Sequence, residues 1–433
     1  MNRRTEPYLV QVGLDFGTAY LKAVCRDIVK DTAWPYVPSG DALEPACLVA
    51  SQVAFAEGRL SRSGAQPLPS VKMALRAAAL EQWDERVLAP YCQVVGDDRE
   101  HLRHFVECCA TYSVSETLAG VRKSIASRLT GFGQRQDDYV AVNMALPVAD
   151  AELPRVNAAF SKVLSAAFTL SERVQADSSI DILEVSAALD AIDIAGEVEA
   201  CFLYPEVSAN VQGFVRSRVS RPGVYLFCDV GAGTVDESVF IYHRNVGEDT
   251  LVYLAADVLP LGSTHLEQRA ADLAGVTDAA AVAEFRRRKE RGRSDPHLDL
   301  ARNEIRSAVA HGTKRTMAKA KKKLHLAAQL ATARVIFGGG GYAEHPYGGG
   351  AASVFHSDLF AQGRKPETLG MPVPVDLELS LGQRAWMPRL SVAYGLSFLR
   401  QDLVPFIYPV DVEPPDPPRI TTSRPKAPSK DEV

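Results

Sequence analysis

Two short segments, more than two hundred residues apart, carry the same succession of chemical groups. Residues 12–22 read VGLDFGTAYLK and residues 226–236 read LFCDVGAGTVD: each has an apolar run, an aspartate, a turn with Gly and Thr, and a second strand-like run. The apolar run predicts a buried strand, and the glycines of the turn let backbone N–H groups approach an anion closely. The aspartate that ends each strand, Asp15 or Asp229, would face a cation. Two such hairpins opposite each other would hold the phosphates of a nucleotide and a Mg²⁺ ion between them.

The groups of the two turns have separate roles in this prediction. Asp15 and Asp229 would hold Mg²⁺ mainly through water, because Mg²⁺ gives up its hydration shell reluctantly. Backbone N–H groups or hydroxyls of the turns would bind the β- and γ-phosphates, with Gly17, Thr18, Ala19 and Tyr20 on one side and Gly231, Ala232, Gly233 and Thr234 on the other. The alternatives are structural: an aspartate that only caps a turn, and a tight hairpin that binds no ligand.

Three further residues are candidates for catalysis of phosphate hydrolysis. The reaction needs a water in line with the γ-phosphate and stabilisation of the charge on its oxygens. We expect Glu206 or Asp236 to orient or deprotonate the water, and Lys72 to neutralise the developing charge. Glu206 follows Pro205, so a carboxylate that only favours a helix N-terminus is the alternative, and a lone Lys before a helix is usually solvated. We expect Lys22, on the strand after the first turn, to be a surface residue.

These residues need strands and helices that bring them together. Apolar runs and alternation predict hairpins over 8–28 and 224–242 and further strands over 46–56, 139–146, 182–187 and 333–337. Apolar recurrence near a period of 3.6 predicts helices over 71–89, 100–130, 152–170, most of 188–215, 278–332 with an interruption near 294–296, and 390–402. Gly-rich hairpins separated by mixed helix and strand indicate an α/β protein with two similar halves. A polar, turn-prone stretch near 215–224 would separate the halves.

With these motifs in this order, the chain resembles the superfamily of actin, sugar kinases and DnaK-type heat-shock chaperones. Residues 15–20 resemble its first phosphate loop, and residues 229–236 resemble its second, in the form closest to the chaperones. A strand that runs into four glycines resembles the adenosine motif, whose residues here are Gly338, Gly339, Gly340 and Gly341. Other segments match in outline: the two connecting helices at 205–210 and 391–396, and the stretch after the second loop at 262–266. Lys72 stands where the chaperones carry a lysine that reaches the γ-phosphate.

The resemblance implies a fold, two ligands and an activity. It implies two similar actin-like (ribonuclease-H-like) domains, at 8–215 and 216–408, that flank a nucleotide cleft, with a Pro-rich flexible tail at 409–433. It implies ATP and Mg²⁺ as ligands of a slow ATPase, a chaperone-like switch whose nucleotide state controls cleft closure and the binding of a protein partner or client. We expect the substrate-binding domain of the chaperones to be lacking, because nothing β-rich follows residue 402. The alternatives are an actin-like ATPase that forms filaments or other oligomers, and a small-molecule kinase of the same fold.

Composition and charge narrow the remaining classes. The chain has 433 residues, a formal charge of −5 and seven cysteines without C-x-x-C spacing, which indicates reduced thiols and a cytoplasmic location. We expect neither a signal peptide nor a membrane-spanning helix, since no stretch is long, apolar and free of charge. The basic stretches 286–293 and 314–323 predict solvated helix faces and, without interleaved aromatics, do not favour a nucleic-acid partner. Within the second stretch, Lys314, Arg315 and Thr316 are candidates for adenine contacts.

Overall fold

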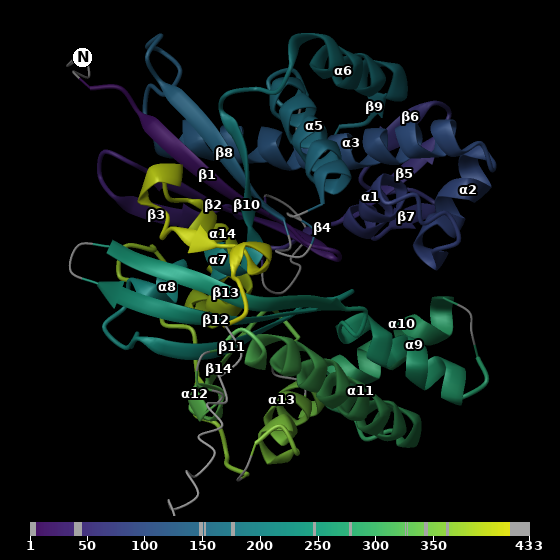
Figure 1. Cartoon of the computed structure of the whole chain (residues 1–433). Helices are drawn as coiled ribbons and strands as arrows, with labels where there is room; N and C mark the ends of the chain where they lie inside the picture. The colour runs from purple at the N-terminus through teal and green to yellow at the C-terminus, as the bar shows by residue number, and fades with distance from the viewer. Residues whose placement is uncertain are drawn as a thin grey trace, which may run out of the picture.

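The computed structural model describes residues 6–38, 46–146, 150, 153–174, 178–245, 248–276, 279–324, 326, 328–341, 345–360 and 363–415. Three β-sheets and the helices that pack on them form a mixed α/β fold (Figure 1). The α/β class expected from the sequence is therefore confirmed. Two of the sheets are large, and each contains one of the two Gly-turn hairpins at its centre.

The first large sheet is built around the first hairpin. β1 (Leu9–Phe16) pairs antiparallel with β2 (Tyr20–Asp27), which pairs antiparallel with β3 (Thr32–Pro35). On its other side, β1 pairs parallel with β8 (Tyr139–Leu146), and β8 pairs parallel with β10 (Cys201–Pro205). The strand order is β10-β8-β1-β2-β3. β1 and β8 are buried along nearly their whole length, which explains why both read as continuous apolar runs.

The second large sheet repeats this topology around the second hairpin. β11 (Gly223–Val230) pairs antiparallel with β12 (Val235–Asn245), which pairs antiparallel with β13 (Glu248–Leu259). β11 also pairs parallel with β14 (Arg334–Gly338), which pairs parallel with β15 (Thr368–Leu369). The order β15-β14-β11-β12-β13 matches that of the first sheet, strand for strand and in the same directions. Each hairpin turn therefore leaves the middle of its own sheet.

Helices pack beside the first large sheet, and a small third sheet contacts two of these helices. α3 (Arg99–Arg128) contacts β2 and packs against α1 (Val71–Ala79), α5 (Pro154–Leu170) and α6 (Ile182–Ala195). The middle of α3 is buried on all its faces because neighbours surround it. The smaller elements of this half are α2 (Ala89–Val95), β4 (Val49–Ala50) beside β2, and a sheet of β7 (Pro67–Pro69), β5 (Gln52–Ala56), β6 (Arg59–Ser61) and β9 (Ile180–Asp181).

A long helix covers the second large sheet. α11 (Pro296–Lys321) packs on β12 and β13 and also contacts α9 (Ser263–Leu273) and α13 (His345–Ser353). The carboxylate of Asp295 accepts hydrogen bonds from two N–H groups of its first turn, and Pro296 takes a position that needs no donor. This cap explains the predicted break near 294–296. α10 (Ala279–Glu290) packs against α9, and α12 (Ala328–Ala331) precedes β14.

Two helices lie between the large sheets (Figure 1): α7 (Glu206–Asn210) and α14 (Met387–Leu396). They approach their neighbours through backbone. A Cβ on Gly13 of β1 would overlap the carbonyl of Ala393 in α14, and a Cβ on Gly395 would overlap a carbonyl in α7. The remaining short elements are α8 (Gln212–Val215), β16 (Phe406–Ile407) beside β13, and 3-10 turns at Arg86–Leu88, Val354–His356, Gly382–Trp386, Arg400–Asp402 and Pro409–Asp411.

The strand predicted at 182–187 is wrong, because this segment begins α6. The side chain of Asp181 accepts a hydrogen bond from the N–H of Leu183 and so caps the helix. Val185 and Leu189, four residues apart, are buried on one face, while Leu183 is 73% exposed. The apolar run is thus one stripe of a helix followed by exposed apolar residues, and its composition resembled a strand only locally.

Other predicted boundaries also shift. The helical reading of 188–215 missed β10, a five-residue strand between α6 and α7. The helix predicted over 71–89 ends at residue 79, and the strand over 46–56 divides between two sheets. The helix predicted over 390–402 is α14 plus a 3-10 turn. Most of the predicted tail, from 416 onward, lies outside the described residues.

The structure also bears on the thiols and on the membrane. All seven cysteines are free, and six of them are buried, including the adjacent pair Cys108 and Cys109 on α3. Adjacent thiols on one buried helix are packing residues in this arrangement. Across the described ranges, no helix combines the length and the apolar character that crossing a bilayer requires.

Candidate functional site

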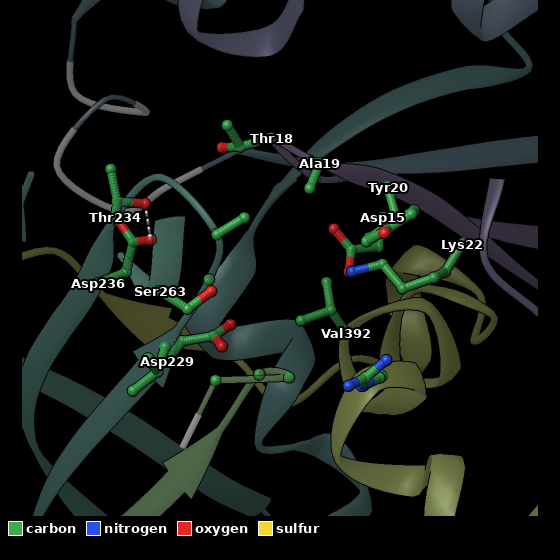
Figure 2. A pocket seen from close by; sticks show the side chains of 18 of the residues that line it. Asp15, Thr18, Ala19, Tyr20, Lys22, Asp229, Thr234, Asp236, Ser263 and Val392 are labelled. Atoms are coloured by element: carbon green, nitrogen blue, oxygen red, sulfur yellow. Dashed lines mark hydrogen bonds and ion pairs between the residues drawn. The ribbon is translucent and has the colours of Figure 1, made fainter. Parts of the chain in front are cut away.

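The two hairpin turns meet at a cavity of about 570 Å³ (Figure 2). Most of the predicted site residues line it: Asp15, Gly17, Thr18, Ala19, Tyr20, Lys72, Glu206, Asp229, Gly231, Ala232, Thr234, Asp236, Gly339, Gly340 and Gly341. Two predicted residues, Gly233 and Gly338, are not among the lining residues. A Cβ on Gly233 would be 2.9 Å from Cγ2 of Thr18, and Gly338 ends β14 against Phe227. The cavity thus gathers residues from β1, β11, α7 and the segment after β14 that are distant in sequence.

The turns keep backbone donors free for a ligand. The first turn of α9 donates to the carbonyls of the second hairpin turn: N–H of Ser263 to Gly231 at 2.9 Å, and N–H of Thr264 to Ala232 at 2.9 Å. The carbonyls of this turn are therefore occupied. Within the described residues, several N–H groups of the two turns donate no hydrogen bond; they belong to Thr18, Ala19, Ala232, Gly233 and Thr234. Free backbone N–H groups in Gly turns are the donors that bind anions in such sites.

Four carboxylates are buried at the floor of the cavity, and among the described residues only two of them form an ion pair with a cation. Asp15 forms an ion pair with Lys22, and Glu206 lies 3.0 Å from the ammonium of Lys72. Asp229 accepts only a hydrogen bond from Asn210, at 3.1 Å, and Asp236 only one from Thr234 Oγ1, at 2.9 Å. The second oxygens of Asp15 and Asp236 are buried without any hydrogen-bond partner. Figure 2 shows Asp15 and Lys22 facing Asp229 and Ser263 across the cavity.

This arrangement shifts the pKa values of the site. Burial raises the pKa of Asp229 well above its ordinary value, and Glu206 and the other carboxylates raise it further. Burial and the charge of Glu206 also raise the pKa of Asp236 to about 7. Burial lowers the pKa of Lys72, but the charge of Glu206 and the two nearby aspartates outweigh it, so the pKa is raised overall and Lys72 stays protonated. The floor therefore favours an added positive charge, either protons or a cation.

The donor set fits a hydrated divalent cation. In the parts of the chain that are described, no group of three or more His, Cys, Asp or Glu side chains lies close enough together to hold a metal ion directly. Buried carboxylate oxygens without partners, on Asp15 and Asp236, are nevertheless available. Mg²⁺ commonly binds through one or two carboxylates, several waters and the phosphates of a nucleotide. Asp15 and Asp229 could hold Mg²⁺ in this way once a nucleotide supplies the remaining oxygens.

Several lining residues were missed by the sequence analysis. Lys22 was expected at the surface but lines the cavity, because β2 leaves the turn beside Asp15. Arg286 and Lys289, three apart on α10, were expected on a solvated face but also line it. Lys289 forms a 2.7 Å ion pair with the buried Glu267. The remaining missed residues are Leu48, Val230, Ser263, Pro388, Arg389 and Val392. The spacing of Arg286 and Lys289 was the one signal that pointed to a common face.

The residues proposed for adenine contacts lie elsewhere. Lys314 pairs with Asp358 at 2.6 Å, and Arg315 lies 4.0 Å from Asp257. Thr316 donates hydrogen bonds to the buried Glu237 and to Asp257. Arg315 and Thr316 attach α11 to β12 and β13, and Lys314 attaches it to the segment at Asp358. Within the described chain, none of the three lines the cavity. The structure thus gives them contacts within the protein and does not bring them to the predicted nucleotide site.

Comparison with known proteins adds no assignment. No model of a protein family matches the chain, and no curated protein matches its sequence. The functional argument therefore rests on the cavity and on its residues.

Proposed function

We propose that this chain binds Mg·ATP in the cavity and hydrolyses it slowly, as an actin-like ATPase of the DnaK-type kind. The observation that carries the proposal is the meeting of two Gly turns, with free N–H groups, above buried carboxylates that lack positive charge. The common order of five strands in the two large sheets supports a pair of related, actin-like domains at about 8–215 and 216–408. The glycines after β14 support a nucleoside that lies beside them.

The residues of the cavity would divide the work of hydrolysis. Bound Mg²⁺ would neutralise charge on the phosphates. Free N–H groups of both turns would bind the β- and γ-phosphate oxygens. Lys72 would approach the γ-phosphate while it remains close to Glu206, and Glu206 or Asp236 would orient the attacking water and take its proton. The pKa of Asp236, about 7, suits a group that exchanges a proton at neutral pH.

The same site could act as a switch. Arg286 of α10 donates a hydrogen bond of 3.3 Å to the hydroxyl of Tyr20, so the halves touch across the cavity. α7 and α14 contact each other between the large sheets, at the place where the halves would hinge. A nucleotide that bridges both turns would favour the closed arrangement, and its hydrolysis would release it. A protein partner or client would respond to this difference.

The direct test measures ATP affinity and phosphate release by the purified chain with and without Mg²⁺, with sedimentation of the same samples. Tight Mg-dependent binding, slow turnover and no pelleting would support the switch. ATP-dependent pelleting would favour the filament-forming alternative, and phosphoryl transfer to a metabolite would favour a kinase. Absence of nucleotide binding at millimolar concentration would refute the proposal.

A further inference from the structure

Arg389 is a cavity residue that no motif explains. It lies in the first turn of α14 and is half-buried in the cavity wall. The other cations of the cavity are paired: Lys22 with Asp15, Lys72 with Glu206, and Lys289 and Arg286 with Glu267. Among the described residues, Arg389 has neither an ion-pair partner nor a hydrogen-bond partner. An unpaired guanidinium at the wall of a cavity has its donors available to a ligand.

Among the described residues, no acid offsets the electrostatic cost of the position of Arg389. A cation in the first turn of a helix is opposed by the helix dipole, which favours negative charge there. Burial of a charge without a partner is also unfavourable. A second positive charge, that of Lys22, lies in the same region as Arg389. Both charges act to lower the pKa of the buried Cys47 thiol, although burial outweighs them and raises this pKa to about 11. These costs would be offset by an anion in the cavity.

The backbone around Arg389 indicates which part of a nucleotide would meet it. The four glycines 338–341, here called the Gly run, are hydrogen-bonded to the end of β11 and to the start of α14. The N–H of Gly341 donates to the carbonyl of Val230 at 3.0 Å, and the N–H of Gly339 donates to the carbonyl of Pro388 at 3.2 Å. A Cβ on Gly340 would lie 3.0 Å from Nε of Arg389. A nucleotide with its outer phosphates at the two turns and its nucleoside beside the Gly run would therefore pass Arg389 with its innermost phosphate.

We propose that Arg389 binds the α-phosphate of the nucleotide and so ties α14 to the ligand. This inference rests on the proposed nucleotide binding and adds a ligand contact outside the phosphate and adenosine motifs. The planar guanidinium can donate two parallel hydrogen bonds to phosphate oxygens. Because Arg389 belongs to α14, the contact connects the ligand to a helix that touches β1 and α7 through backbone.

This connection gives the contact a mechanical consequence. Asp15 lies one residue before the end of β1, and α7 begins at Glu206, so α14 packs against the two elements that carry the first aspartate and the candidate base. Contacts without intervening side chains transmit small displacements, because packed backbone has little room to adjust. A nucleotide bound through Arg389 would order the start of α14 and fix its place against both elements.

The experiment compares R389Q and R389K with the unmodified chain. The control is R384Q, which removes an exposed arginine from the neighbouring 3-10 turn. Binding of ATP, ADP, AMP and adenosine is measured by calorimetry in Mg²⁺ buffer. Hydrogen exchange of α14 is followed with and without ADP. We expect R389Q to weaken ATP, ADP and AMP by a similar factor, about 10- to 100-fold, and to leave adenosine unchanged. R389K should lose less of its nucleotide affinity than R389Q, and R384Q should bind all four ligands like the unmodified chain.

The outcomes are distinguishable from failure of the proposed function. If the unmodified chain binds no nucleotide, the proposed function falls first and this contact with it. If the unmodified chain binds ATP and R389Q binds ADP and AMP as tightly as the unmodified chain does, the contact is refuted. Loss of adenosine binding by the same factor would place Arg389 at the base and overturn the assignment, as would an effect on ATP alone. ADP-dependent protection of α14 in the unmodified chain that is absent in R389Q would support it.

Discussion

The charge at the floor of the cavity is unbalanced in the protein alone. Lys22 and Lys72 neutralise Asp15 and Glu206, whereas Asp229 and Asp236 have only uncharged donors. Both unneutralised carboxyls have raised pKa values because they are buried near other acids. If Asp229 and Asp236 served only the fold, we would expect cationic side chains of the protein to neutralise them. Buried carboxylates without a neutralising partner are typical of a site that binds a cation or exchanges a proton.

Glu206 gives the most direct test of catalysis at the residue scale. We expect Glu206→Gln to keep Mg·ATP binding and to slow hydrolysis by about 10²-fold or more, since an amide cannot accept the proton of the attacking water. The glutamine oxygen can still accept a hydrogen bond from Lys72, so the position of the ammonium should survive. Single-turnover phosphate release measures the rate, and calorimetry measures the affinity.

A matched control for this variant is Glu184→Gln. Glu184 also lies in the first turn of a helix, α6, but it is exposed and lies outside the cavity. Hydrolysis by Glu184→Gln should be unchanged. Equal rates for both variants would return Glu206 to a structural role at the start of α7, where a carboxylate is favoured by the helix dipole alone.

At the scale of elements, the glycines after β14, residues 338–341, combine a positive φ with close contacts to the site. Gly339 has φ +78°, and a Cβ there would overlap both Oδ1 of Asp229 and the carbonyl of Val230. Gly339→Ala should therefore combine backbone strain of about 1–2 kcal/mol with a displacement of Asp229. We expect a lower urea midpoint and a loss of Mg-dependent ATP binding.

The chain offers a control that separates these two effects. Gly275 has φ +71°, and a Cβ there would meet nothing within 4 Å. Gly275→Ala should show the strain alone, with ATP affinity unchanged in calorimetry. If Gly339→Ala lost no more stability than Gly275→Ala and kept its ATP affinity, the Gly run would not need its close approach to Asp229.

Local patterns predicted the elements that carry both turns, but not every neighbour of the site. The hairpins and the strand before Gly338 depend on short-range signals: apolar runs and Gly turns. α10 reads as a basic helix whichever face is buried, so the sequence could not show that Arg286 and Lys289 line the cavity. Likewise, the chemistry of Lys314 to Thr316 suited a ligand, yet Arg315 and Thr316 contact acids of β12 and β13, and Lys314 pairs with Asp358. Such pairings depend on tertiary packing, which local pattern does not contain.

For the whole molecule, repetition in the sequence corresponded to repetition in the fold. Two copies of one hairpin motif lie in two sheets with the same strand order. The sequence did not predict how the chain returns from the second sheet to the first through α14, because the contacts of Gly13 and Gly395 are backbone to backbone and leave no apolar pattern. The mistaken strand at 182–187 had no effect on the site, since α6 packs on the outer helices.

The unbalanced floor should make the stability of the whole protein depend on pH and Mg²⁺ together. Above pH about 4 the carboxyl group of Asp229 loses its proton in the unfolded chain, whereas in the folded chain it keeps its proton to a higher pH. The carboxyl group of Asp236 also keeps its proton in the folded chain, up to pH about 7. The folded state thus binds more protons in this window, and its free energy of unfolding falls as pH rises. Mg·ATP should restore the loss at pH 8, because metal and protons compete for the same carboxylates.

Asp229→Asn isolates this effect, since the amide can still accept a hydrogen bond from Asn210. The Tm of the variant should rise relative to that of the unmodified chain between pH 5 and pH 8 without ligand. Added Mg·ATP should raise the Tm of the unmodified chain more at pH 8 than at pH 6, and that of the variant little at either pH. The control is Asp97→Asn, at an exposed aspartate before α3, and it should follow the unmodified chain throughout. If the Tm difference between Asp229→Asn and the unmodified chain were independent of pH, the unneutralised carboxylate would not destabilise the fold and would need no cation.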